Sequence, residues 1–117
     1  MARSNKPIVW GLFAGGGTVT AFLSPVLVLV LGLAVPFGLY SAEDLSYDRV
    51  MAVIGNPLGA LVLFGFITLA LWHAAHRTRT TVHDLGIHND AMTAKVCYGL
   101  AALGTLAAAV ALVQVAF

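Results

Sequence analysis

Residues 57–85 read PLGALVLFGFITLALWHAAHRTRTTVHDL, an apolar stretch that passes directly into a polar one. Asn56-Pro57 marks its start, because asparagine commonly caps a helix and proline suits the first helical position. Gly86 follows the stretch and is typical of the residue at which a helix ends. The sequence therefore predicts one long helix over residues 57–85.

The apolar part of this helix is short for a membrane-spanning segment. Every residue from Leu58 to Trp72 is apolar except Thr68, which gives about 22 Å of helix at ~1.5 Å per residue. The hydrocarbon core of a bilayer is about 30 Å thick. We therefore expect His73 and His76 to lie inside the edge of the membrane, at the depth of an amphiphilic headgroup.

Two further apolar stretches, over residues 19–40 and 96–117, complete the fold prediction. The chain is 60% hydrophobic and 9% charged, which leaves too few polar residues to cover a soluble domain. We expect an all-α membrane protein with three transmembrane helices, forming a single membrane-anchor domain over residues 1–117. Residues 7–17, which include Trp10, are expected to form an interfacial segment before the first helix.

The basic residues predict how the helices are oriented. Arginine and lysine gather at the N-terminus and around the second connector, whereas the first connector is mainly acidic. The residues are Arg3 and Lys6, then Arg77, Arg79 and Lys95, with Arg49, Glu43, Asp44 and Asp48 in the first connector. Because cytoplasmic loops carry the excess of positive charge, we expect a cytoplasmic N-terminus and a C-terminus outside.

Several function classes are excluded by motif and composition. The chain has no Walker loop, GxSxG or HExxH motif, and Gly15-Gly16-Gly17 lacks the Lys-Ser/Thr of a phosphate-binding loop. A formal net charge of +1 does not provide the clustered basic face of a nucleic-acid-binding protein. The single cysteine, Cys97, excludes an internal disulfide. We expect no catalysis by this chain alone and no nucleic-acid partner.

The polar residues after the apolar stretch fall on one face of the helix, at spacings of 3, 1, 3, 3 and 1: His73, His76, Arg77, Thr80, His83 and Asp84. The positive charge of Arg77 disfavours binding of a metal cation at this face. Haem is disfavoured because the other two predicted helices contain no histidine that could serve as its second ligand. A quinone headgroup suits this face. Arginine, which stays charged, can donate hydrogen bonds to the quinone oxygens, and histidine, with an unperturbed pKa near ~6.5, can carry protons. Anchoring to lipid phosphates is the other interpretation, and the spacing favours both equally.

Several short motifs, spread over most of the chain, form a specific signature together. They are Val9-Trp10-Gly11-Leu12-Phe13-Ala14-Gly15-Gly16-Gly17, Ser24-Pro25-Val26, Leu45-Ser46-Tyr47-Asp48-Arg49-Val50, Leu71-Trp72, His76-Arg77, His83-Asp84-Leu85 with Ile87-His88, and Tyr98-Gly99-Leu100-Ala101-Ala102. In these motifs the chain resembles the D subunit of bacterial fumarate reductase (quinol:fumarate oxidoreductase), which is a hydrophobic membrane anchor.

The resemblance implies a multi-pass anchor in the bacterial cytoplasmic (inner) membrane, within a four-subunit complex for anaerobic electron transfer to fumarate. Its partners would be a second three-helix anchor (the C subunit), the iron–sulfur subunit (B) and the flavoprotein subunit (A). FAD and the iron–sulfur clusters would be held only by those partners, and this chain would hold no haem. Menaquinol would bind at a shared site, to which this chain would contribute Trp10, His76 and Arg77.

The chain also departs from the family pattern. Thr78-Arg79-Thr80 follows Arg77 where the family is often richer in histidine, and His73 replaces a position that does not titrate. Gly55-Asn56-Pro57 departs from the family near a proposed second quinone site, so the resemblance does not carry that site over to this chain. Two alternatives stay open. One is the membrane anchor of a succinate dehydrogenase, including a haem-bearing anchor, and the other is a purely structural anchor without quinone contacts.

Overall fold

The computed structural model describes residues 5–117 and is helical outside short connectors. Its elements in chain order are α1 (Lys6–Leu27), the π-helix η1 (Val28–Ala34), the short 3₁₀ helix η2 (Ala42–Leu45), α2 (Tyr47–Ile54), α3 (Pro57–Asp84) and α4 (Asp90–Ala116). Within the described residues, three helical stretches are long and apolar enough to cross a membrane: Lys6–Ala34, Pro57–Asp84 and Asp90–Ala116. The predicted all-α fold with three such helices is confirmed.

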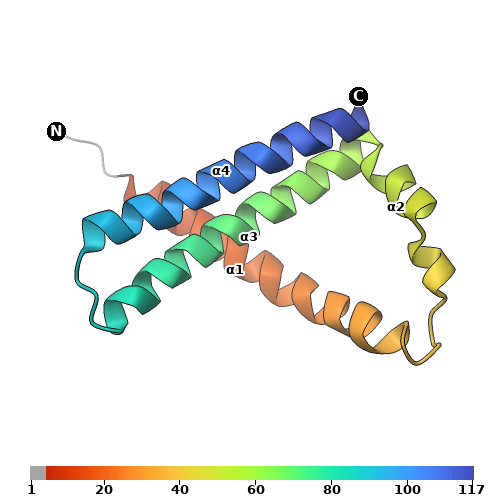
Figure 1. Cartoon of the computed structure of the whole chain (residues 1–117), viewed down its shortest axis with the longest axis horizontal. Helices are drawn as coiled ribbons and strands as arrows, with labels where there is room; N and C mark the ends of the chain where they lie inside the picture. Colours follow the sequence, from red (N-terminus) through yellow and green to blue (C-terminus); the bar gives the residue numbers. More distant parts are fainter. Residues whose placement is uncertain (1–4) are drawn as a thin grey trace.

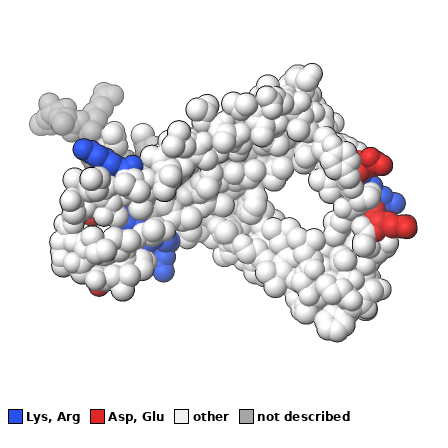
Figure 2. All heavy atoms as spheres, viewed as in Figure 1, with Lys and Arg blue, Asp and Glu red and all other residues white. Residues whose placement is uncertain are grey.

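The long helices form an open, flat arrangement. Figure 1 shows α3 and α4 running antiparallel and side by side, while α1 crosses α3 near its polar end and then diverges. The space-filling view in Figure 2 shows an opening between the diverging part of α1, the region of α2 and the α3–α4 pair. The molecule measures 53 × 34 × 20 Å along its principal axes. Among the described residues, α3 is the long helix that packs against both of the others.

The chain has almost no core of its own. Within residues 5–117 the buried residues are small, apart from one leucine: Gly16, Ala60, Ala75, Ala101 and Leu112. Large apolar side chains cover the outside of all three long helices instead. This pattern fits a chain whose apolar surface contacts lipid or other membrane subunits, because a bilayer is as apolar as leucine.

The first helix differs from the prediction. It begins at Lys6 and runs without a break through residues 7–17, where a separate interfacial segment was expected before a helix starting at residue 19. Pro7 suits the first turn of a helix, and Gly15, Gly16 and Gly17 lie inside α1, which contacts α3 there. The helical stretch also ends at Ala34 rather than at residue 40.

Proline and glycine shape the end of this first stretch. Pro25 lies inside α1 and cannot donate a backbone hydrogen bond, and the helix widens into η1 shortly after it. The chain then turns through Gly38, whose φ of +71° is readily adopted only by glycine.

The ends of α3 agree with the prediction. The Asn56 side chain accepts a hydrogen bond from the Leu58 N–H at 2.9 Å, which is the expected cap. Gly86 has a φ of +92° just beyond the last turn. The next helix, α4, begins at Asp90 instead of residue 96, because Asn89 caps it by accepting from the Met92 N–H at 3.3 Å.

Among the described residues, the charged side chains seen in Figure 2 lie at the two ends of the molecule. Figure 2 shows lysine and arginine concentrated at the end where α1 begins, and a second, mostly acidic group at the opposite end. The acidic group belongs to the first connector, where Arg49 pairs with Asp44. The long helices between these ends present an uncharged surface in this view.

Candidate functional site

The site is built at the crossing of α1 and α3. A Cβ atom placed on Gly16 would overlap the Leu69 carbonyl oxygen and lie 2.7 Å from His73 Cβ. One placed on Gly17 would lie 2.9 Å from His73 Cε1. The absence of side chains at these two positions therefore allows the backbones of α1 and α3 to touch, as is common between membrane helices.

His73 joins α1 to α3. Its Nδ1 lies 2.9 Å from the Phe13 carbonyl oxygen, and since a carbonyl only accepts, Nδ1 carries the proton and donates it. The rings of His73 and Phe13 also stack, with centroids 4.7 Å apart and planes 7° from parallel. The structure thus gives His73 a contact within the chain that accounts for its presence on the polar face.

His76 contacts all three long helices. It belongs to α3, its Nδ1 lies 2.8 Å from the Tyr98 hydroxyl on α4, and its ring packs 4.6 Å from that of Phe13 on α1. The side chain is half-buried. Within residues 5–117 its Nε2 forms no hydrogen bond, so this nitrogen remains available to an outside partner.

Tyr98, on α4, is itself contacted by two further side chains of α3. Trp72 stacks on its ring at 5.8 Å, and the Arg79 guanidinium lies 5.9 Å from its ring centroid. Arg79 in turn pairs with Asp90 through hydrogen bonds of 2.8 and 3.3 Å. Because both partners are partly exposed, the ion pair adds little energy by itself, but it fixes the guanidinium beside Tyr98.

The predicted site residues lie at the same end of α1 and α3. Arg77 follows His76, is exposed, and forms no hydrogen bond or ion pair in the described part of the chain. Trp10 is 68% exposed and lies one helical turn before Phe13 on α1. Among residues 5–117 there is no ring contact between Trp10 and His76, whereas Phe13, one turn after Trp10, packs against His76.

Thr80 and His83, further along the predicted polar face, make contacts within the chain. The Thr80 hydroxyl donates to carbonyl oxygens of its own helix, at 2.9 Å to Arg77 and 3.2 Å to His76. The ring of His83 packs edge-on against His88 at 5.0 Å. No group of histidine, cysteine and acidic residues in the described part of the chain could hold a metal ion.

Comparison with known proteins shows the family to which the sequence is similar. A family model described as the D subunit of fumarate reductase matches residues 1–113. The chain is 45% identical to the fumarate reductase D subunit of Vibrio parahaemolyticus over 92% of this chain and 86% of that one. It is 39% identical to the D subunit of a Shewanella species over 96% of this chain and 93% of the relative.

The chain belongs to the family of fumarate reductase D subunits.

The resemblance found in the sequence motifs is therefore confirmed. As a D subunit, the chain is a membrane anchor of a multi-subunit complex and a multi-pass membrane protein. Its exposed apolar surface and small core are consistent with that role.

Two residues of the site in this D subunit were not assigned from the sequence. Phe13 and Tyr98 belong to motifs that carried the resemblance, but neither was given a role. Spacing along α3 shows which residues share its face, whereas the contacts of Phe13 and Tyr98 with His76 join different helices. The signal that could have found them is the aromatic type of each residue at the same expected depth as His76.

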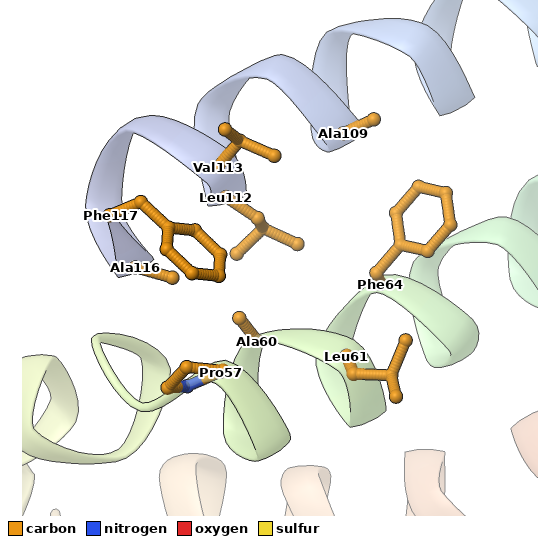
Figure 3. A pocket seen from close by; sticks show the side chains of 9 residues that line it. All are labelled: Pro57, Ala60, Leu61, Phe64, Ala109, Leu112, Val113, Ala116 and Phe117. Atoms are coloured by element: carbon orange, nitrogen blue, oxygen red, sulfur yellow. The ribbon is translucent and has the colours of Figure 1, made fainter.

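A separate apolar cavity lies at the other end of the D subunit, between α3 and α4 (Figure 3). It measures about 360 Å³ and is lined by Pro57, Ala60, Leu61, Phe64, Ala109, Leu112, Val113, Ala116 and Phe117. Its lining side chains offer no hydrogen-bond donor to a quinone oxygen. The polar site therefore remains at the opposite end, around His76.

Proposed function

We propose that this D subunit anchors the flavoprotein and iron–sulfur subunits of fumarate reductase to the membrane and supplies part of its menaquinol site. The observation that carries the proposal is His76, whose Nδ1 is engaged by Tyr98 while Nε2 has no partner in the described chain. Arg77 follows it directly and is exposed. These groups fit a quinone headgroup, which needs hydrogen-bond donors and a proton acceptor next to its oxygens.

Each residue has a distinct part in this proposal. Menaquinol is the substrate and supplies two electrons and two protons, and the electrons reduce fumarate in the partner subunits. His76 accepts a proton at Nε2, Arg77 stabilises negative charge on the neighbouring oxygen, and Trp10 offers an indole N–H and a flat apolar surface. The remainder of the site belongs to the second anchor and the iron–sulfur subunit.

The test compares two rates of fumarate reduction in complexes with substitutions at Trp10, His76 or Arg77. One rate is driven by menaquinol, and the other by a reduced viologen dye that bypasses the membrane site. Selective loss of the first rate supports the proposal. Equal loss of both rates assigns the residues to assembly, and loss of neither favours a purely structural anchor.

The orientation of the chain follows the same proposal. The end carrying Arg77, Arg79 and Lys95 faces the cytoplasm, where the iron–sulfur subunit binds, and the C-terminus lies outside the inner membrane. We expect reporter fusions after residue 45 and at the C-terminus to report an external location, and a fusion near residue 89 a cytoplasmic one. A cytoplasmic C-terminus would contradict this topology.

We also expect no haem bound by this chain. Three of the four histidines lie on α3, and His88 lies in the connector after it, next to His83. Two ligands on one helix cannot flank a porphyrin plane. An optical spectrum of the purified complex checks this, and a Soret band that disappears on His76→Ala would show the expectation to be wrong.

A further inference from the structure

We propose that Tyr98 is a positioning residue that orients the His76 imidazole and stabilises it as it takes up a proton from quinol. This inference rests on the proposed function, because it assigns Tyr98 a role only through His76. The juxtaposition that carries it is the 2.8 Å contact between the Tyr98 hydroxyl on α4 and His76 Nδ1 on α3.

The contact fixes which ring nitrogen faces outward. An imidazole ring can rotate by half a turn about its bond to Cβ, which exchanges the positions of Nδ1 and Cδ2. A hydrogen bond to the Tyr98 hydroxyl favours the orientation in which Nδ1 faces α4. The ring of Phe13, on α1, packs against the imidazole with ring centroids 4.6 Å apart, which restricts the imidazole further. Nε2 is therefore the nitrogen presented to an outside group.

The position of the hydroxyl is determined by groups other than His76. Tyr98 stacks with Trp72 on one side and lies beside the Arg79 guanidinium, which is tied to Asp90 at the start of α4. These contacts hold the tyrosine ring whether or not His76 is present. The hydroxyl is thus a fixed reference for the imidazole rather than a group that follows its movement.

Tyrosine also suits the chemistry expected of His76. To accept a proton at Nε2, the neutral imidazole must carry its hydrogen on Nδ1, which then donates to the Tyr98 oxygen. When the quinol O–H bond breaks and the Nε2–H bond forms, the Nδ1–H remains and its hydrogen bond becomes charge-assisted. Charge-assisted hydrogen bonds are roughly twice as strong as neutral ones. The contact therefore strengthens during proton transfer, which lowers the barrier instead of tightening substrate binding.

Substitution Tyr98→Phe in the assembled complex tests the proposal. It removes the hydroxyl and keeps the ring that contacts Trp72 and Arg79. We expect kcat with menaquinol to fall about 10-fold, equivalent to ~1.4 kcal/mol, while KM changes by less than about 2-fold. The dye-driven rate of the same amount of membranes, which reports how much complex has assembled, should equal that of the unsubstituted complex.

Two comparisons separate a positioning role from a structural one. Tyr47→Phe, at an exposed tyrosine outside the site, is the matched control and should leave kcat with menaquinol unchanged. In a complex that already carries His76→Gln, Tyr98→Phe should cause no further loss, because residues that act through one another are not additive.

The outcomes distinguish this inference from the proposed function. If His76→Gln impairs menaquinol turnover but Tyr98→Phe does not, the quinol role of His76 stands and the role of Tyr98 is wrong. Additive losses in the double variant, or a parallel fall in the dye-driven rate, would also overturn it. If His76→Gln has no effect on menaquinol turnover, the proposed role of His76 fails, and that of Tyr98 fails with it.

Discussion

Complexes carrying Arg77→Leu are expected to lose menaquinol-driven fumarate reduction by about 10- to 150-fold, which corresponds to the roughly 1.5–3 kcal/mol of a hydrogen bond from a charged donor. Arg77 is exposed and has no hydrogen-bond or ion-pair partner within residues 5–117. Its side chain is therefore available to a ligand or to a neighbouring protein of the complex. Since an arginine cannot lose its proton, it favours the more anionic oxygen of the headgroup.

The dye-driven rate should be unchanged in the same membranes, because the reduced dye delivers electrons without the membrane site. Arg49→Leu is the matched control, since Arg49 lies at the opposite end of the molecule and pairs with Asp44. It should leave both rates unchanged. A parallel loss of both rates in the Arg77 variant would mean that Arg77 serves assembly instead of quinol turnover.

Gly16→Leu is expected to prevent assembly of the complex. Even a Cβ atom at this position overlaps the Leu69 carbonyl oxygen and lies 3.0 Å from the Leu69 carbonyl carbon. These are backbone atoms that cannot move aside without separating the two helices. Overpacking of this kind costs roughly 1–3 kcal/mol or more, and it displaces Phe13 from both histidines. We expect membrane-bound, dye-driven fumarate reductase activity to fall at least about 10-fold.

Gly11→Leu is the control for this substitution, because no atom lies within 4 Å of a Cβ built at Gly11 on the same helix. It should leave the amount of membrane-bound, dye-driven activity close to normal. Assembly of the Gly16→Leu complex at the unsubstituted level would show that α1 and α3 do not cross at Gly16 in the complex.

The sequence predicted α3 well because its boundaries are set by local interactions. The Asn56 cap and the glycine after the last turn act within a few residues of the helix ends. The predicted start of the first helix, at residue 19, differs from the observed start at Lys6, because that region depends on a contact between helices. Glycine weakens an isolated helix by about 1 kcal/mol per residue, but Gly16 is retained in α1 because it allows contact with α3. That contact cannot be read from the residues around Gly16 alone.

For the candidate site, too, the sequence predicted which residues share one helix but not the contacts between helices. His76 and Arg77 were placed together by their spacing on one helix, and the structure keeps both at the polar end of α3. The contacts of His76 with Phe13 and Tyr98 depend on where three helices meet, which spacing does not determine. His73 shows the same limit, because its hydrogen bond to the Phe13 carbonyl oxygen is set by the helix crossing.

The most direct test of the account is binding of a fluorescent naphthoquinone analogue to the purified complex, measured by titration with and without Arg77→Leu. If the polar end of α3 forms part of the menaquinol site, the substitution should raise Kd about 10- to 150-fold. Dye-driven activity of the same preparations verifies that the complex is intact. An unchanged Kd with unchanged stoichiometry would contradict the account and leave this chain as a structural anchor.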